Sequence, residues 1–213
     1  MIEQITDKTI LVLAPHTDDG ELGCGGTIAK LCAQGNRVFY IAFSSCNNSL
    51  PEQFPQDTLK AEVKKAVAVL GIAAEHLILL DYSVREFKDN RQSILDAMIG
   101  IRESYNPDIV FLPSSYDIHQ DHQVIYEEGL RAFKFISIFG YELPWNNLMF
   151  NPRFFIKLSK EEINKKAAAL MEYQSQLHRP YLDKDFIFSQ ARVRGGQLAS
   201  VYAEAFEVIR IVL

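Results

Sequence analysis

The sequence predicts an α/β fold in which a mostly parallel sheet is flanked by helices. Short apolar runs alternate with amphipathic helical stretches from Thr9 to Phe135, a pattern typical of βαβ units. No repeat, low-complexity segment or long linker divides the 213 residues, a length that suits one domain with a sizeable core. The prediction is a single Rossmann-like domain over residues 1–213. Its ligand site is expected at the C-terminal edge of the strands.

The first predicted unit is a strand, a turn and a helix. Residues 9–13 form an apolar run, and residues 26–34 have helical character until Gly35 ends the helix. Residues 37–43 form the next apolar strand. Because the connections are short, these two strands are expected to be parallel neighbours.

The middle of the chain continues this alternation. Gly71 ends one helical pattern, and Pro107 stops another because proline cannot continue the hydrogen-bond ladder. The polar loop at 44–51 can contact a polyhydroxylated ligand or serve as a plain connection. The expected elements are helices at 56–70, 91–105 and 124–135 and strands at 77–80 and 108–112.

The last third of the chain changes character. Residues 139–147 are rich in aromatic and amide side chains and are assigned no element. Within them, residues 141–145 can form a sugar-stacking wall, a subunit contact or part of the core. Ser159 and Glu162 match the capping-box pattern that starts a helix. The expected elements are strands at 153–158 and 206–212 and helices from 160 to about 177 and at 197–205.

Composition and charge exclude several classes of function. The formal net charge of −5 leaves no basic excess, which argues against nucleic acid or an anionic membrane as a partner. The three cysteines form no CxxC pair, so a reducing compartment is favoured over a disulfide framework. No apolar run approaches the roughly 18 residues of a membrane span, and the N-terminus lacks a signal-peptide pattern. The expectation is a cytoplasmic enzyme or binding protein that can assemble as a homo-oligomer.

Polar clusters follow two of the predicted strands, each at the point where its strand ends. If these strands are parallel neighbours, both clusters meet at one edge of the sheet, where open α/β proteins bind ligands. Three of the five histidines of the chain lie in these clusters. The clusters comprise His16, Asp18 and Asp19 after strand 9–13, and His119, Asp121 and His122 after strand 108–112.

The spacing of these residues favours a metal site. His16 and Asp19 are three residues apart on a turn that enters a helix, so both side chains can lie on one side. His122 can supply a third ligand from the other strand end. Two histidines and one carboxylate with an open fourth position are typical of catalytic Zn²⁺, and Fe²⁺ also occupies such sites. A water bound there has its pKa lowered toward neutrality.

The remaining groups of the clusters can handle protons. Asp18 is the natural general base for that water and can return the proton to a leaving amine. His119 can stabilise an oxyanion if protonated, and Asp121 can orient or charge one of the flanking histidines. The competing interpretations are structural: aspartates at a helix N-terminus commonly cap free N–H groups, and the second cluster can be a solvated loop.

A nucleotide-binding loop is a rival interpretation of the first cluster. Gly23, Gly25 and Gly26 follow a strand and open a helix, but the dinucleotide fingerprint would require a glycine where Ile28 stands. No GKS or GKT sequence follows either. The glycines are therefore predicted to allow close backbone approach and tight helix packing, with Cys24 as a small packed residue.

Together the motifs resemble a known family. Pro-His-Thr-Asp-Asp at 15–19, Leu-Gly-Cys-Gly-Gly-Thr at 22–27 and His-Gln-Asp-His at 119–122 resemble the PIG-L/LmbE-like zinc N-deacetylases. Those enzymes remove the acetyl group from N-acetylglucosaminyl and related amino-sugar conjugates. Weaker matches at 106–108, 141–142 and 173–176 extend the resemblance over nearly the whole chain.

The resemblance implies the same roles for the site residues. His16, Asp19 and His122 would bind zinc, and Asp18 would be the base. His119 would assist the oxyanion, with Asp121 as its partner.

The sequence also departs from the family pattern. Thr17 replaces the usual proline, and Gly20 displaces the usual glutamate to Glu21. The loop at 46–48 lacks the usual Gly-Glu pair and the stretch at 59–62 lacks the usual arginine, so the particular substrate stays open.

The predicted function is a zinc-dependent N-deacetylase acting on a small amino-sugar substrate. Amide hydrolysis on a non-sugar substrate and non-catalytic binding of a sugar or nucleotide are the alternatives.

Overall fold

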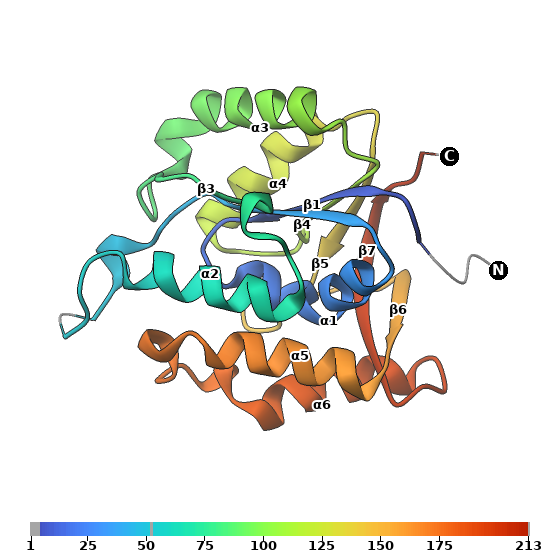
Figure 1. Ribbon diagram of the computed structural model, residues 1–213. Coiled ribbons are helices and arrows are strands. Elements are labelled where there is room, and N and C mark those ends of the chain that lie inside the picture. The colour runs from blue at the N-terminus through green and yellow to red at the C-terminus, as the bar shows by residue number, and fades with distance from the viewer. Residues whose placement is uncertain (1–4, 52, 213) are drawn as a thin grey trace.

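A seven-stranded sheet runs through the molecule in this computed structural model, which describes residues 5–51 and 53–212 (Figure 1). The strand order is β3-β2-β1-β4-β5-β7-β6, and β7 is antiparallel to both of its neighbours. All other neighbouring pairs are parallel, so the predicted α/β class with a mostly parallel sheet is confirmed. The strands are β1 (Thr9–Ala14), β2 (Arg37–Ala42), β3 (Leu77–Leu79), β4 (Ile109–Pro113), β5 (Ser137–Tyr141), β6 (Phe154–Leu158) and β7 (Tyr202–Arg210).

Helices cover both faces of the sheet. In Figure 1, α3 and α4 lie above it, whereas α1, α2, α5 and α6 lie below, with α5 packed across α1 and α2. The helices are α1 (Asp19–Ala33), α2 (Thr58–Leu70), α3 (Arg91–Tyr105), α4 (Gln120–Ala132), α5 (Lys160–Met171) and α6 (Lys184–Gly196). Short 3-10 helices lie at Asn47–Ser49, Ala74–His76, Phe87–Asn90, Gln174–Gln176 and Pro180–Leu182.

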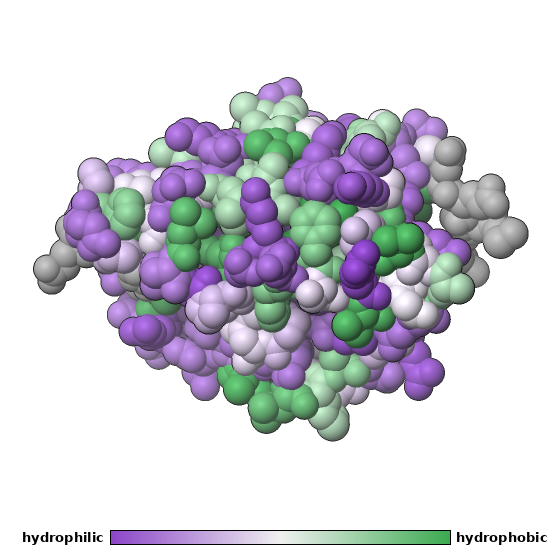
Figure 2. All heavy atoms as spheres, turned by 90° about the horizontal axis from the view of Figure 1, so that it is seen from below, coloured by the Kyte–Doolittle hydropathy of each residue, from purple (hydrophilic) through white to green (hydrophobic). Residues whose placement is uncertain are grey.

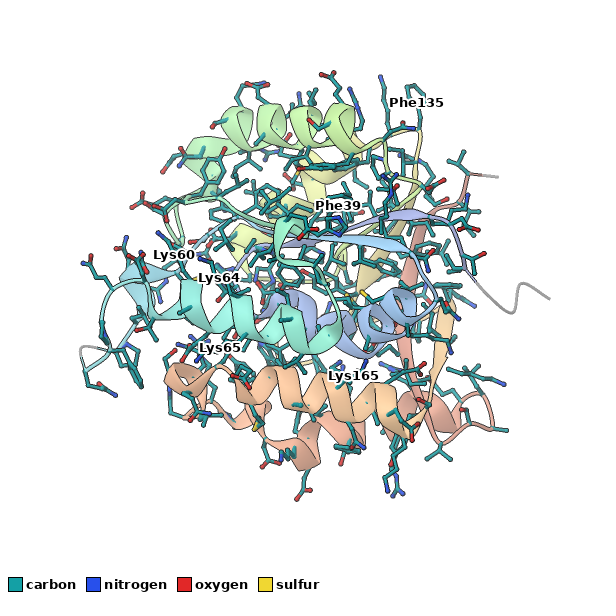
Figure 3. The ribbon with its side chains drawn as sticks, viewed as in Figure 1. Phe39, Lys60, Lys64, Lys65, Phe135 and Lys165 are labelled. Atoms are coloured by element: carbon teal, nitrogen blue, oxygen red, sulfur yellow. The ribbon has the colours of Figure 1, made fainter. Side chains whose placement is uncertain are left out.

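Strand β1 lies between two hydrophobic clusters, one on each face of the sheet. Ile10 and Val12 belong to the cluster beneath the sheet, and Leu11 and Leu13 to the cluster above it. All four side chains are fully buried, which explains the unbroken apolar run that is typical of a central parallel strand. Phe39 of β2 belongs to the upper cluster and is labelled near the middle of the view in Figure 3.

The strand order reverses at β1. The chain continues from β1 to β2 and β3 on one side, and β4 and β5 occupy the other side. The loops that leave the carboxyl ends of β1 and β4 therefore diverge and leave a crevice, the usual ligand site of such sheets. Because β1 and β4 are parallel neighbours, with Leu11 opposite Val110, the two polar clusters meet as predicted.

Two predicted elements near the site had wrong bounds. Helix α1 begins at Asp19 and not at residue 26, so the glycine-rich segment is helical, with a break at Cys24 (φ −146°, ψ 25°). Glycine disfavours helix, but contacts with neighbouring elements hold this segment in place. Helix α4 begins at Gln120 and ends at Ala132, so the second polar cluster lies at its N-terminus and not on a loop before it.

The C-terminal third contains the other differences. Strand β5 occupies part of the aromatic stretch to which no element was assigned, and α5 ends at Met171, well before 177. The predicted helix at 197–205 is wrong, because α6 ends at Gly196 and β7 begins at Tyr202. The alanines of β7 favour helix by propensity, but this segment pairs with β6, with Ala203 opposite Lys157.

The outer face of the α5 and α6 layer is mainly hydrophilic. Seen from below, it shows several separate apolar groups among polar side chains (Figure 2). Val193 on α6 is one exposed apolar residue, and Phe135 lies exposed at the opposite end of the molecule (Figure 3). Within the described part of the chain, no helix has both the length and the apolar character that crossing a membrane requires.

Candidate active site

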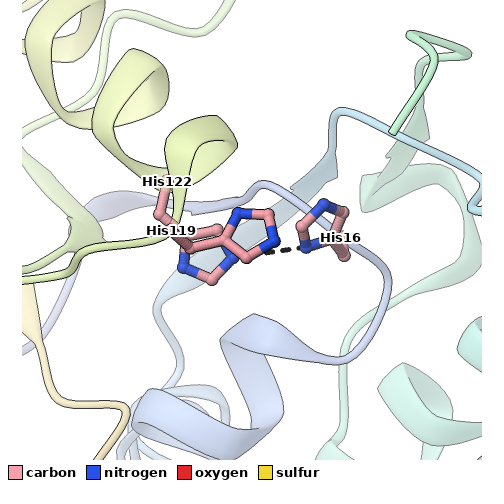
Figure 4. A group of neighbouring side chains, drawn as sticks. All are labelled: His16, His119 and His122. Atoms are coloured by element: carbon pink, nitrogen blue, oxygen red, sulfur yellow. Dashed lines mark hydrogen bonds between the residues drawn. The ribbon is translucent and has the colours of Figure 1, made fainter. Parts of the chain in front are cut away.

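The loop after β1 and the first turn of α4 bring three ligand atoms together. Asp19 Oδ2 lies 3.1 Å from His16 Nδ1 and 3.2 Å from His122 Nε2, and the two nitrogens are 3.2 Å apart. Figure 4 shows the two imidazoles facing each other across this last contact. Ligand atoms on a tetrahedral zinc are about 3.3 Å apart when each metal–nitrogen bond is about 2.0–2.1 Å. The three residues therefore fit one face of a tetrahedral divalent cation.

The electrostatics of this triangle favour a positive charge at its centre. Burial opposes ionisation of Asp19, but the charges of His122 and His16 outweigh it and hold the pKa of Asp19 well below its usual range. Burial likewise opposes protonation of His122, yet Asp19 and a hydrogen bond to Asp117 raise its pKa to about 10. A proton or a metal cation can supply the positive charge that these groups favour.

Each histidine of the triangle has a carboxylate on its second nitrogen. Asp117 Oδ2 lies 2.7 Å from His122 Nδ1, and Asp121 Oδ2 lies 3.0 Å from His16 Nε2. Both carboxylates are buried, so they fix the orientation of the rings and raise the basicity of the nitrogens that face the triangle. Asp121 thus pairs with His16, whereas the resemblance implied His119 as its partner.

Asp117 was absent from the sequence prediction. It lies on the turn after β4, five residues before His122, and a buried bond to a histidine leaves no periodic signal in the sequence. The only cue was a further aspartate close to the His-Gln-Asp-His motif.

His119 stands beside the triangle rather than in it. Its ligand nitrogen, together with those of His16 and His122, forms a wider group within 4.8 Å (Figure 4). Its Nδ1 accepts a hydrogen bond from the Asp121 backbone N–H at 3.2 Å, which leaves the proton of the neutral ring on Nε2. Burial and the charge of His122 lower the pKa of His119 to about 4. This pKa favours the neutral ring at pH 7, which can still donate one hydrogen bond from Nε2.

Asp18 occupies the N-cap position of α1 without capping it. Its side chain accepts no hydrogen bond from the first turn of the helix, so the capping interpretation fails for this residue. Asp18 is 9 % exposed and lines a cavity beside the triangle. Burial and the neighbouring charge of Asp19 raise the pKa of Asp18 above its usual value, a direction that favours a proton-accepting role.

The displaced glutamate has a structural explanation. Glu21 is fully buried, and its two carboxyl oxygens bond to the hydroxyls of Tyr40 and Tyr173, which also bond to the backbone oxygen of Thr17. A side chain at Gly20 would place its Cβ 2.5 Å from the Tyr40 ring. The carboxyl at position 21 therefore supports the turn at 15–18 from inside, while position 20 has no room for a side chain.

A cavity of about 390 Å³ opens beside these groups, within the usual size range of small-molecule sites. Asn48 and Gln176 contribute to its wall, so the loop at 44–51 and the weak match at 173–176 both reach the site. In the aromatic stretch, Tyr141 is core, with its hydroxyl bonded to the Leu13 backbone oxygen, whereas Trp145 lines the cavity. The sequence prediction had not included the other lining residues Val84, Arg85, Asn146, Arg179 and Tyr181.

Comparison with known proteins places this fold and site in a family. A family profile described as "PIG-L: GlcNAc-PI de-N-acetylase" matches residues 11–133, which include all six predicted site residues. The chain belongs to this family. The resemblance drawn from the motifs is therefore confirmed.

Individual relatives and one solved structure are similar to this PIG-L chain over long stretches. The "uncharacterized deacetylase YaiS" of Escherichia coli is 28 % identical over 174 residues, which cover 79 % of this chain and 91 % of that protein. A diacetylchitobiose deacetylase of Thermococcus kodakarensis is 28 % identical over 140 residues, covering 62 % of this chain and 51 % of that protein. The crystal structure of the conserved protein TT1542 from Thermus thermophilus has a TM-score of 0.79 at 26 % identity, covering 97 % and 96 % of the two chains.

Proposed function

We propose that this protein is a metal-dependent N-deacetylase that removes the acetyl group from an N-acetylated amino sugar or its conjugate. The observation that carries the proposal is the triangle of His16, Asp19 and His122. Beside it in one cavity lies the carboxylate of Asp18, which does not cap its helix. Membership of the PIG-L family and the similarity to a diacetylchitobiose deacetylase support the choice of an amino-sugar substrate.

The residues of the chain divide the chemistry among them. A divalent metal, when bound, polarises the acetamide carbonyl and acidifies water at the site. Asp18 takes a proton from the attacking water and later gives it to the nitrogen that leaves as the free amine. His119 donates its Nε2–H to the carbonyl oxygen as that oxygen gains negative charge. Asp117 and Asp121 keep the ligand imidazoles oriented.

The test is release of free amine from a panel of N-acetyl amino sugars, their conjugates and N-acetylated non-sugar amines. Release is expected with added zinc and is expected to stop with chelator. Asp18→Ala is expected to lower turnover by about 10²–10⁴-fold, the range that a positioned acid–base group supplies, while metal content stays near that of the wild type. Asp96→Ala, on the exposed face of α3, is the matched control and is expected to retain full turnover.

Three results would contradict parts of this proposal. A fully active Asp18→Ala variant would show that Asp18 is not the general base. Release of amine only from N-acetylated non-sugar amines would support amide hydrolysis but contradict an amino sugar as the substrate. Stoichiometric sugar binding without turnover, in protein that contains its metal, would favour the non-catalytic alternative.

A further inference from the structure

The cavity wall carries a guanidinium group that the proposed reaction leaves unused. Arg179 lines the cavity with Asp18 and Asp19, yet the ion pairs within residues 5–51 and 53–212 all involve other side chains. Its Nε is buried and has no hydrogen-bond partner among those residues. A buried N–H without an acceptor is unfavourable, so the group is suited to an acceptor that arrives with a ligand.

The surrounding residues hold Arg179 in this position. Its Nη1 donates to the Tyr181 hydroxyl, and the Tyr181 ring stacks on Trp145 with centroids 3.9 Å apart and planes 9° from parallel. The turn that precedes Arg179 is anchored on α2, because Glu62 accepts hydrogen bonds from the Ser175 backbone N–H at 2.9 Å and from its hydroxyl at 2.6 Å. The guanidinium is thus preorganised, as a binding group needs to be.

A second arginine lines the same cavity from another loop. Arg85 lies between β3 and α3 with a left-handed backbone (φ 71°), and its backbone N–H donates to Asp121 Oδ2 at 2.7 Å. This bond fixes the loop to the carboxylate that orients His16, while the Arg85 side chain stays exposed at the cavity wall. Two cations on separate loops are a typical arrangement for an anion, since guanidinium groups match the geometry of carboxylate and phosphate.

We propose that Arg179, assisted by Arg85, binds an anionic group of the substrate, a carboxylate or a phosphate attached to the N-acetylated sugar. This inference rests on the proposed function and narrows its substrate class to acidic amino-sugar conjugates. A rival role for Arg179 is to act on Asp18 through its charge, which lowers the pKa of that carboxyl. The two roles can be distinguished, because an effect of Arg179 on the pKa of Asp18 would change the reaction of neutral and anionic substrates alike.

Trp145 is the single tryptophan of the chain and lines the cavity, so its fluorescence can report binding without turnover. The probes are N-acetylglucosamine 1-phosphate, N-acetylmuramic acid and the neutral methyl glycoside of N-acetylglucosamine. One or both anionic probes are expected to bind the metal-loaded protein at least about tenfold more tightly than the neutral probe, which corresponds to about 1.4 kcal/mol. The phosphate and carboxylate arms show which anion the site prefers.

Arg179→Gln is expected to weaken binding of the anionic probes about tenfold more than binding of the neutral probe, which abolishes the preference, while the unfolding midpoint stays near that of the wild type. Arg179→Lys keeps the charge and is expected to retain part of the preference. The matched control is Arg192→Gln on the exposed face of α6, which removes the same charge outside the cavity and is expected to change nothing. Equal binding of charged and neutral probes by the wild type, including no binding of either, would overturn the inference. An equal loss for all probes in Arg179→Gln would also overturn it.

The binding result and the amine-release result separate the two proposals. A preference for anionic probes without release of amine would support the anion site and contradict the proposed deacetylase activity. Release of amine at equal rates from anionic and neutral sugars would support the deacetylase activity and contradict the anion site.

Discussion

At the scale of the residue, Glu21 in the first turn of α1 is the least expected group near the site. It is fully buried, and burial raises its pKa to about 8 in spite of hydrogen bonds from Tyr40 and Tyr173. The neutral carboxyl can donate to one tyrosine and accept from the other. It thereby supports the backbone of Thr17, which precedes the proposed base Asp18.

This burial predicts a dependence of stability on pH. The carboxyl of Glu21 has a pKa of about 8 in the folded state against a usual value of 4.5, so the folded protein holds a proton that the unfolded chain releases between these values. The free energy of unfolding is therefore expected to fall with rising pH in this window, by about 1 kcal/mol per pH unit from this group. Glu21→Gln, which imitates the neutral carboxyl, is expected to lack that contribution. Urea unfolding of both proteins across the window measures it, and parallel pH profiles would contradict it.

The carboxylate of Asp117 gives a second prediction at this scale. Its bond to His122 Nδ1 fixes the ring that faces the triangle, and an amide oxygen or nitrogen cannot replace the charge. Asp117→Asn is expected to weaken zinc binding about 10–100-fold, the usual effect of losing a carboxylate behind a metal-binding histidine. Competition with a chromophoric chelator measures the affinity. Asp96→Asn is the control on the protein surface, and an unchanged affinity for the Asp117 variant would show that the carboxylate has another role.

At the scale of the element, helix α1 owes its shape to a buried ion pair from the C-terminal third of the chain. Lys166 Nζ donates to the Leu22 backbone oxygen at 2.7 Å, at the end of the first helical segment. Glu204 accepts from the backbone N–H groups of Gly26 and Thr27, at the start of the second segment, and pairs with Lys166 at 2.7 Å. The pair thus caps both sides of the break at Cys24.

Removing one partner of this pair is expected to destabilise the protein. Lys166→Met leaves the Glu204 charge buried without its partner and is expected to lower the free energy of unfolding by about 3–5 kcal/mol. Lys166→Met combined with Glu204→Gln is expected to recover part of the loss, because no unpaired charge then remains. Urea unfolding measures both. Lys165→Met is the matched control, since the neighbouring Lys165 is exposed on α5 (Figure 3) and its change is expected to stay within about 0.5 kcal/mol.

The sequence could predict the elements whose signal is local. The apolar runs of β1 and β4 and the polar residues at their ends were enough to predict that the clusters converge. The helix break at Cys24 could not be predicted in this way, because its caps come from residues more than a hundred positions away. Strand β7 was missed over its first half for the same reason, since pairing with β6 overrides the helix propensity of its alanines.

At the scale of the whole molecule, the proposed metal site connects two segments that are distant in the sequence. His16 and Asp19 come from the end of β1 and the start of α1, and His122 comes from α4, on the opposite face of the sheet. The sequence could point to these three residues because they cluster at strand ends. The carboxylates behind them and the wall with Arg179 depend on turns and on the C-terminal third, which tertiary contacts determine.

A metal ion that binds these segments only when the protein is folded is expected to stabilise the whole protein against unfolding. Zinc at about a thousand times its dissociation constant adds about 4 kcal/mol to the free energy of unfolding. For a chain of this size, that corresponds to a rise of about 8–16 °C in Tm, and chelator is expected to reverse it. His122→Ala is expected to lose most of the rise, whereas His178→Ala, at an exposed position outside the cavity, is expected to keep it. Equal shifts in both variants, measured by differential scanning calorimetry, would mean that zinc binds elsewhere on the surface.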